Sequence, residues 1–281
     1  MNLFVYTLQE EARATILKTL NDLAAQNNSN LFDRFSVRIN SMQSGLAKDD
    51  LKVLLLSNIL PRTIYLPKVD NKEDLNNFFG CFQKEIIKKY PIKKNKTLSE
   101  TIEPIDLIIF VESARGLLNL REICQHAMEM FEYIPIRLSG IVFGSDDFCA
   151  SIGATRSDEG KEVLFARQQV VLISKAYDLQ AIDTVYINYK DLDGLRDKSI
   201  EGSAIGFTGK QAIHPNQVPV IQEAFRPSDQ KIQWAKGLIE EFGNAQKDGK
   251  GAFVYQGQMI DMPLLKQAYN VLNIAKSIGK A

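Results

Sequence analysis

Histidine and cysteine are both scarce in this chain of 281 residues. The two histidines, His126 and His214, are too few for a histidine-rich metal site. The three cysteines, Cys81, Cys124 and Cys149, lie far apart and are odd in number, which fits neither a disulfide framework nor a zinc knuckle. This cysteine usage indicates a protein of a reducing compartment.

Excess charge, long apolar runs and nucleotide-binding motifs are also absent. The 34 basic side chains balance 34 acidic ones, so the net charge favours neither nucleic acid nor an anionic membrane as a partner. No apolar run approaches the ~20 residues of a membrane span, and residues 1–7 resemble neither a signal peptide nor a transit peptide. Neither a G-x-G-x-x-G fingerprint nor a Walker A motif occurs, which argues against a Rossmann oxidoreductase.

Short apolar runs alternate with helical patterns along most of the chain. Strands are predicted near residues 35, 63, 106, 140, 182 and 206, and residues 4–6 could form a seventh. Helices are predicted for residues 8–25, 51–60, 71–90 (with Asp70 as N-cap), 116–131, 158–177, 215–225, 228–245 and 263–278. This βαβ rhythm predicts an α/β protein with a parallel sheet. A closed (β/α)8 barrel needs eight strands, whereas an open doubly wound sheet needs fewer, and the strand count leaves both possible.

Acidic residues follow two of the predicted strands. Glu112 ends the run 105–111, and Asp146 and Asp147 come after the run 140–144. The ends of strands carry the chemistry in α/β barrels, and carboxylate oxygens suit a hard divalent cation. These acids therefore predict a cation site at the edge of the sheet. The structural alternatives are an ion pair for Glu112 and an N-cap or turn for Asp147.

Five short motifs stand in a fixed order along the chain. They are FVESARG at 110–116, VFGSDDF at 142–148, AIDTVY at 181–186, GFTGKQAIHP at 206–215 and MIDMP at 259–263. In this order, and from about residue 10 onward, the chain resembles the citrate lyase β-subunit-like proteins of the wider malyl-CoA/citramalyl-CoA lyase family, and in particular their animal mitochondrial branch. The resemblance implies a (β/α)8 TIM barrel and a mitochondrial homotrimer. It also implies a Mg²⁺-dependent carbon–carbon lyase that cleaves citramalyl-CoA to pyruvate and acetyl-CoA, with malate or β-methylmalate synthase as a side activity.

The resemblance implies roles for three residues of the predicted sheet. Glu112 and Asp147 would be the Mg²⁺ ligands, with Asp147 preferred to its neighbour Asp146. Arg38, on the predicted strand near residue 35, would bind the substrate carboxylate in the bidentate geometry that suits arginine. A structural pair between Arg38 and Glu112 is the alternative.

Three further residues acquire roles in the same way. Ile213 and His214, after the glycine-bearing turn 206–210, would contact the acyl-CoA. Asp261 would be a catalytic acid delivered from a neighbouring subunit, although its position before Met262-Pro263 also fits a simple N-cap. Lys68 could meet the phosphates of CoA or be an ordinary surface charge.

The first two strands of the family have no match here, because the resemblance begins only at residues 10–13. We therefore expect residues 1–225 to form an N-terminally truncated barrel and residues 226–281 a C-terminal helical segment that packs on a neighbouring subunit. A missing start would also remove any transit peptide. The competing function is that of an inactive acyl-CoA-binding remnant.

Overall fold

The computed structural model describes residues 3–26, 35–91, 98, 100–247 and 253–277. The chain divides into two compact units. The first comprises Met1–Ile187 and Ala204–Gln211, and the second comprises Asn188–Ser203 and Ala212–Ala281. Among the helices that the structure describes, none combines the length and the apolar character that a membrane span requires.

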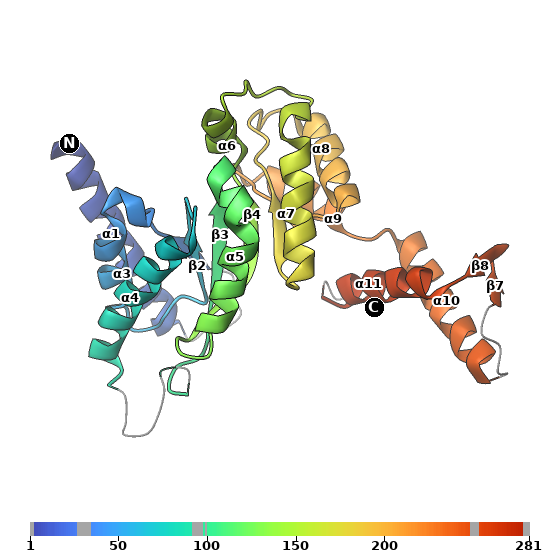
Figure 1. Cartoon of the computed structure of the whole chain (residues 1–281), viewed down its shortest axis with the longest axis horizontal. Helices are drawn as coiled ribbons and strands as arrows, with labels where there is room; N and C mark the ends of the chain where they lie inside the picture. Colours follow the sequence, from blue (N-terminus) through green and yellow to red (C-terminus); the bar gives the residue numbers. More distant parts are fainter. Residues whose placement is uncertain (1–2, 27–34, 92–97, 99, 248–252, 278–281) are drawn as a thin grey trace. The chain divides into compact units, whose positions relative to one another are not determined.

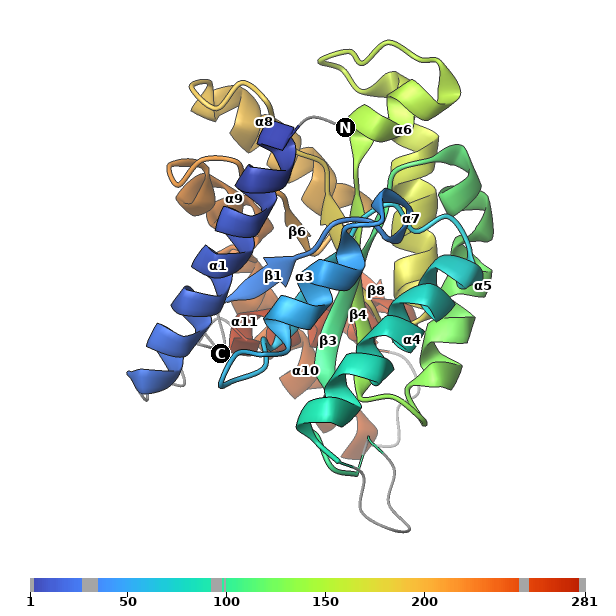
Figure 2. The same cartoon turned by 90° about the vertical axis from the view of Figure 1, so that its left-hand side faces the viewer.

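A curled parallel sheet of six strands forms the centre of the first unit (Figure 2). The strands are β1 (Ser36–Arg38), β2 (Thr63–Leu66), β3 (Ile105–Val111), β4 (Ile136–Phe143), β5 (Gln180–Asp183) and β6 (Gly209–Lys210). Each strand pairs in parallel with the next one along the chain. A doubly wound sheet reverses its strand order at a switch point, and this sheet does not, so the topology is that of part of a (β/α) barrel.

The six predicted strands are confirmed, but the seventh is wrong. Residues 4–6 belong to helix α1 (Leu3–Ala25). No glycine or proline separates them from the helical pattern that follows, so nothing in the sequence stops the helix from extending back over them. A closed eight-stranded barrel is therefore not formed by the residues that the structure describes, in which β1 and β6 are edge strands.

The helices of the first unit lie on the outer side of the sheet (Figures 1 and 2). They are α1, α3 (Ala47–Leu54), α4 (Lys72–Lys89), α5 (Ala114–Met130), α6 (Ser145–Ile152) and α7 (Leu164–Ala176), with short 3₁₀ turns at Met42–Ser44 and Lys161–Val163. The helix predicted at 51–60 lies several residues earlier, and the one predicted from 158 begins at Leu164. Helix α6 was not expected.

The N-cap of α4 is Asn71, and the prediction of Asp70 is wrong. The side chain of Asn71 accepts a hydrogen bond from the backbone N–H of Asp74 at 3.0 Å. The carboxylate of Asp74 in turn accepts from the N–H of Asn71, which completes a capping box. Asp70 is free for another contact, and its carboxylate accepts a hydrogen bond from the hydroxyl of Ser113.

Strand β3 is buried on both faces, as expected of a strand in a parallel sheet. Leu107 and Ile109 face the helices and are fully buried. Ile108 and Phe110 point to the other face, where they form a cluster with Val142 of β4. Burial of each such side chain stabilises the fold by roughly 1.5–3 kcal/mol. The strand that precedes Glu112 is therefore held firmly in the core.

The second unit is mainly helical. It holds α8 (Leu192–Ile205) up to Ser203, α9 (Gln217–Phe225), α10 (Asp229–Lys247), a hairpin of β7 (Phe253–Tyr255) and β8 (Gln258–Ile260), and α11 (Met262–Ser277). Helices α10 and α11 pack side by side through a buried cluster that includes Leu238, Leu265 and Ala268. The predicted helices from 215 onward are confirmed, whereas α8 and the hairpin were not expected. The proposed division at residue 225 stays a prediction.

Candidate active site

Glu112 follows the last residue of β3 and lies partly buried at the carboxyl end of the sheet. Its Oε2 atom accepts a hydrogen bond from the backbone N–H of Lys68 at 2.9 Å. Burial raises the pKa of the Glu112 carboxyl, the Lys68 N–H lowers it, and the charge of Asp147 raises it again. The charges of Lys68 and Arg38 act in the lowering direction. A partly buried carboxylate beside a second carboxylate favours a cation at this point.

Asp147 lies in the first turn of α6, directly after the next strand, β4. Its carboxylate is half exposed, and Oδ1 accepts from Nζ of Lys68 at 3.2 Å. The alternative that Asp147 caps the helix is wrong, because Gly144 occupies the N-cap position and no side chain caps it. Glu112 and Asp147 therefore come from adjacent strands and interact electrostatically.

The neighbouring carboxylate, Asp146, is engaged elsewhere. It forms an ion pair with Arg156, whose Nη2 atom also donates to the carbonyl oxygen of Val185 at 2.8 Å. Asp147 is thus the acid of this pair that faces Lys68, which supports the choice of Asp147 over Asp146 as the candidate ligand.

The backbone at Gly144 leaves space for the side chain of Glu112. A Cβ atom at residue 144 would lie 2.5 Å from Cγ of Glu112 and 2.9 Å from its Oε1 atom. Real Cβ contacts are not that short, so any side chain here would have to displace the carboxylate. Sequence reasoning missed this role, and its one signal was a glycine between a strand and two acids.

Arg38 is the last residue of β1 and is exposed. It acts on Glu112 through its charge, and no direct ion pair between these two described residues forms. The chain just after β1 is anchored by Asp50, which accepts from Nε of Arg13 and from the N–H of Asn40, both at 2.8 Å. Arg38 thus lies at the carboxyl end of β1, close enough for its charge to act on Glu112.

A buried cluster of three charged side chains links the ends of β5 and β6. Asp183 accepts hydrogen bonds from Nε and Nη2 of Arg167 at 3.0 and 2.9 Å, and from Nζ of Lys210 at 3.1 Å. Asp183 is fully buried, and the other two side chains are nearly so. Gln211, the next residue, donates from Nε2 to the carbonyl oxygen of Phe143 at the end of β4. These contacts hold the ends of β4, β5 and β6 together. Because the partners are distant in sequence, no local pattern indicates these contacts.

The remaining predicted site residues belong to the second unit. The backbone N–H of Ile213 donates to Oε1 of Gln217 at 2.8 Å. The ring of His214 stacks on Tyr189 with a centroid distance of 5.1 Å, and its Nδ1 atom accepts from the N–H of Asn216.

Asp261, also in the second unit, caps helix α11. Its Oδ1 atom accepts from the N–H of Leu264 at 3.1 Å, so the capping role considered for this residue is formed. The structure thus brings Arg38, Glu112 and Asp147 together in the first unit, whereas Ile213, His214 and Asp261 are part of the second.

Two carboxylates are enough for the predicted ion. No group of three or more His, Cys, Asp or Glu side chains that could hold a metal occurs among the described residues. Mg²⁺, however, keeps several waters and usually takes one or two protein carboxylates, with substrate oxygens completing its shell. The carboxylate oxygens of Glu112 and Asp147, which follow adjacent strands, fit such an open site.

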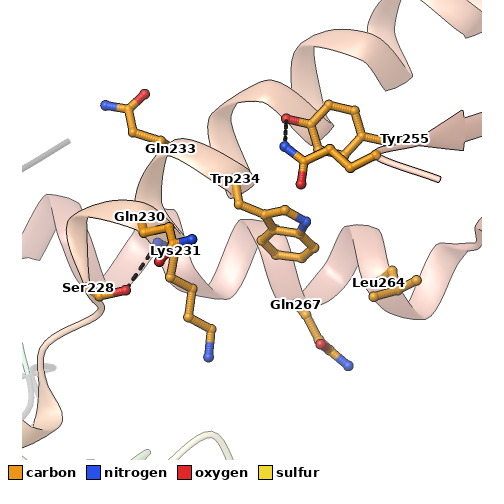
Figure 3. A pocket seen from close by; sticks show the side chains of 9 residues that line it. Ser228, Gln230, Lys231, Gln233, Trp234, Tyr255, Leu264 and Gln267 are labelled. Atoms are coloured by element: carbon orange, nitrogen blue, oxygen red, sulfur yellow. Dashed lines mark hydrogen bonds between the residues drawn. The ribbon is translucent and has the colours of Figure 1, made fainter. Parts of the chain in front are cut away.

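A separate pocket of about 610 Å³ lies in the second unit (Figure 3). Its walls come from α10, α11 and the hairpin, and they include Trp234, Tyr255 and several glutamines. No acidic residue lines it, and none of the predicted site residues does. This pocket therefore offers no carboxylate ligand for a metal ion.

Comparison with known proteins gives a consistent result. The family described as HpcH/HpaI aldolase/citrate lyase matches residues 5–215. The human protein named citramalyl-CoA lyase, mitochondrial, is 47% identical over 270 residues, which cover 96% of this chain and 75% of the human one.

Solved structures show the same fold. A citrate lyase from Burkholderia xenovorans aligns with a TM-score of 0.73 at 20% identity, covering 94% of this chain and 80% of that one. The protein CitE of Mycobacterium tuberculosis, solved in complex with magnesium, acetoacetate and coenzyme A, aligns with a TM-score of 0.61 at 28% identity, covering 86% and 78%. The predicted family and the predicted lyase class are confirmed: the chain belongs to the HpcH/HpaI aldolase/citrate lyase family.

Proposed function

We propose that this chain is a Mg²⁺-dependent lyase that cleaves citramalyl-CoA to pyruvate and acetyl-CoA. The observation that carries the proposal is that Glu112 and Asp147, which follow adjacent strands, both accept a hydrogen bond from Lys68. The name of the human relative supports the substrate, and the magnesium in the CitE structure supports the ion. From the name of the human relative, we also propose that the protein is mitochondrial.

The cleavage is a retro-aldol reaction. A base removes the proton of the tertiary hydroxyl, the bond between the carbinol carbon and the neighbouring CH₂ breaks, and the carbinol carbon becomes the ketone of pyruvate. The electron pair of the broken bond passes to the carbon α to the thioester carbonyl, which gives the enolate of acetyl-CoA. Mg²⁺ would act as a Lewis acid toward the hydroxy acid and orient it. Glu112 and Asp147 would hold the ion, and Arg38 would bind the substrate carboxylate through two parallel hydrogen bonds. Protonation of the enolate by a general acid then gives acetyl-CoA.

We assign the role of general acid to Asp261, which would be delivered from a neighbouring subunit of a homotrimer. We assign contacts with the acyl-CoA to Ile213 and His214. In the same proposal, the curled sheet is part of a (β/α)8 barrel, and residues 226–281 pack on the neighbouring subunit. Truncation of the barrel at its N-terminus stays a prediction.

Asp261→Asn separates the capping role from the catalytic one. Asparagine caps helices about as well as aspartate, so we expect the melting temperature to stay within ~2 °C of wild type. It cannot supply a proton, so kcat should fall by about 10²–10⁴-fold. Thermal unfolding and steady-state kinetics measure the two effects. A fully active variant would leave Asp261 with the capping role alone.

Gly144→Ala should displace Glu112 without unfolding the protein. The new Cβ would overlap the side chain of Glu112, whose Cγ lies only 2.5 Å away. Because a misplacement of about 1 Å in a catalytic group can cost 10²-fold, we expect kcat/KM to fall by roughly that factor. The matched control is Gly80→Ala in α4, where nothing lies within 4 Å of the added Cβ. Equal activity of the two variants would contradict the proposed position of Glu112.

Product analysis separates the proposed function from its alternatives. With citramalyl-CoA, the lyase yields pyruvate and acetyl-CoA in equal amounts. With glyoxylate and acetyl-CoA or propionyl-CoA, a malate or β-methylmalate synthase activity yields the corresponding hydroxy diacid. An inactive acyl-CoA-binding remnant binds the thioesters and yields neither. A higher kcat/KM for the synthase reaction than for the cleavage would mean that the synthase reaction, and not the cleavage, is the main activity.

A further inference from the structure

Lys68 touches both candidate metal ligands through two different groups. Its backbone N–H donates to Oε2 of Glu112 at 2.9 Å, and its ammonium donates to Oδ1 of Asp147 at 3.2 Å. The ammonium thus pairs directly with Asp147, and its charge also acts on Glu112. In the sequence, a lysine directly after a strand does not indicate contacts with two acids.

The backbone of Lys68 adopts a conformation that lysine rarely takes. Its φ angle is +55°, in the left-handed region that glycine favours. The residue after it, Val69, is buried, and the carbonyl oxygen of Asp70 accepts from Nδ2 of Asn119 at 2.9 Å. These contacts hold the segment against α5, so the surrounding structure maintains the left-handed turn that directs the N–H toward Glu112.

The ion pair between Lys68 and Asp147 is exposed and easily broken. Both side chains are about half exposed, at 49% and 52%. A lysine has a long flexible stem and can move its ammonium into water at little cost. An exposed pair of this kind contributes little stability, so a divalent cation with a stronger attraction to Asp147 can replace it.

We propose that Lys68 is a positioning residue of the metal site, and that its ammonium occupies the cation position beside Asp147 until a divalent cation binds. The inference rests on the metal site of the proposed function. The backbone N–H holds Glu112 in both states. In the metal-free protein, the ammonium offsets the repulsion between the two carboxylates. When the cation enters, the ammonium leaves Asp147.

The test measures binding of Mn²⁺ alone, without substrate, by the loss of the free-ion electron paramagnetic resonance signal. Lys68→Met removes the competing cation and keeps the backbone N–H, so we expect about three- to tenfold tighter binding. Lys68→Arg keeps the charge and should bind as wild type does. Lys72→Met is the matched control, because its ammonium pairs with the exposed carboxylate of Glu122 at 2.9 Å, away from both candidate ligands.

A second substitution at Lys68 tests whether a change in Mn²⁺ binding comes from loss of the ammonium and not from a change in folding. Lys68→Gly removes the ammonium and relieves the left-handed strain, and it should bind Mn²⁺ more tightly as well. Glu112→Gln, measured in parallel, tests the site itself and should weaken binding. If Glu112→Gln weakens binding but neither Lys68 variant tightens it, the role of Lys68 is refuted and the metal site stands. If Glu112→Gln binds as wild type does, the metal site is refuted and the role of Lys68 with it.

Discussion

Glu112→Gln should lower kcat/KM for Mg²⁺-dependent cleavage by at least about 10³-fold, because it removes a charged oxygen ligand from the ion that stabilises the transition state. Glutamine has nearly the same shape as glutamate and can still accept the N–H of Lys68. Burial raises the pKa of Glu112, which means that the folded protein disfavours its charge. A neutral amide should therefore leave the free energy of unfolding within about 1 kcal/mol of wild type.

The matched control is Asp106→Asn on the same strand. Asp106 lies near the other end of β3, where its carboxylate pairs with Arg137 at 2.7 Å on the surface. Steady-state kinetics over a range of Mg²⁺ concentrations should find this variant fully active. If Glu112→Gln turned over like the control, the proposed roles of the active-site residues would be wrong.

Asp183→Ala should destabilise the protein by about 3–5 kcal/mol, because it removes the carboxylate that two buried cations share. Asp183 has no exposed surface, and it accepts hydrogen bonds from both Arg167 and Lys210. Breaking a buried pair by deleting one partner leaves charge in a poorly solvated place. Urea unfolding, followed by circular dichroism, gives the change in the free energy of unfolding.

The control for this substitution is Glu122→Ala on α5. Its carboxylate is 57% exposed and pairs with Lys72 at 2.9 Å. Exposed ion pairs contribute roughly 0–1 kcal/mol, so this variant should unfold nearly like wild type. A similar loss of stability in the two variants would show that the buried cluster contributes no more to the free energy of unfolding than an exposed ion pair does.

Because Asp183 ends the strand beside β4, we also expect the Asp183→Ala variant to bind Mn²⁺ less tightly.

The strands that carry the site were predictable from local sequence. The runs 63–66 and 105–111 have the bounds of β2 and β3, because each is a short apolar segment with clear limits on both sides. Once the runs 105–111 and 140–144 are parallel strands, the acids that follow them must lie at one edge of the sheet. The position of Glu112 and Asp147 at that edge therefore follows from the sequence pattern alone.

Other elements gave weak signals. Helix α8 contains two glycines, which lowers its helical propensity. The strands of the hairpin are only three residues long, too short to show alternation. Its turn, with Gln256 and Gly257 both at positive φ, is the feature that a pattern search could have used.

The contacts that refine the site could not be read from the sequence. The left-handed turn at Lys68 depends on how the segment after β2 packs against α5. The closeness of Gly144 to Glu112, and the sharing of Asp183 by two cations, join residues 16 to 32 positions apart, and local patterns say nothing about such pairs.

The central claim is tested most directly by a coupled assay of the purified protein with citramalyl-CoA, in which lactate dehydrogenase and NADH report the release of pyruvate. We predict pyruvate formation that needs Mg²⁺, stops on addition of EDTA and returns when Mg²⁺ is restored. Folded protein that binds acetyl-CoA but releases no pyruvate at any Mg²⁺ concentration would contradict this claim and would favour a non-catalytic acyl-CoA-binding protein.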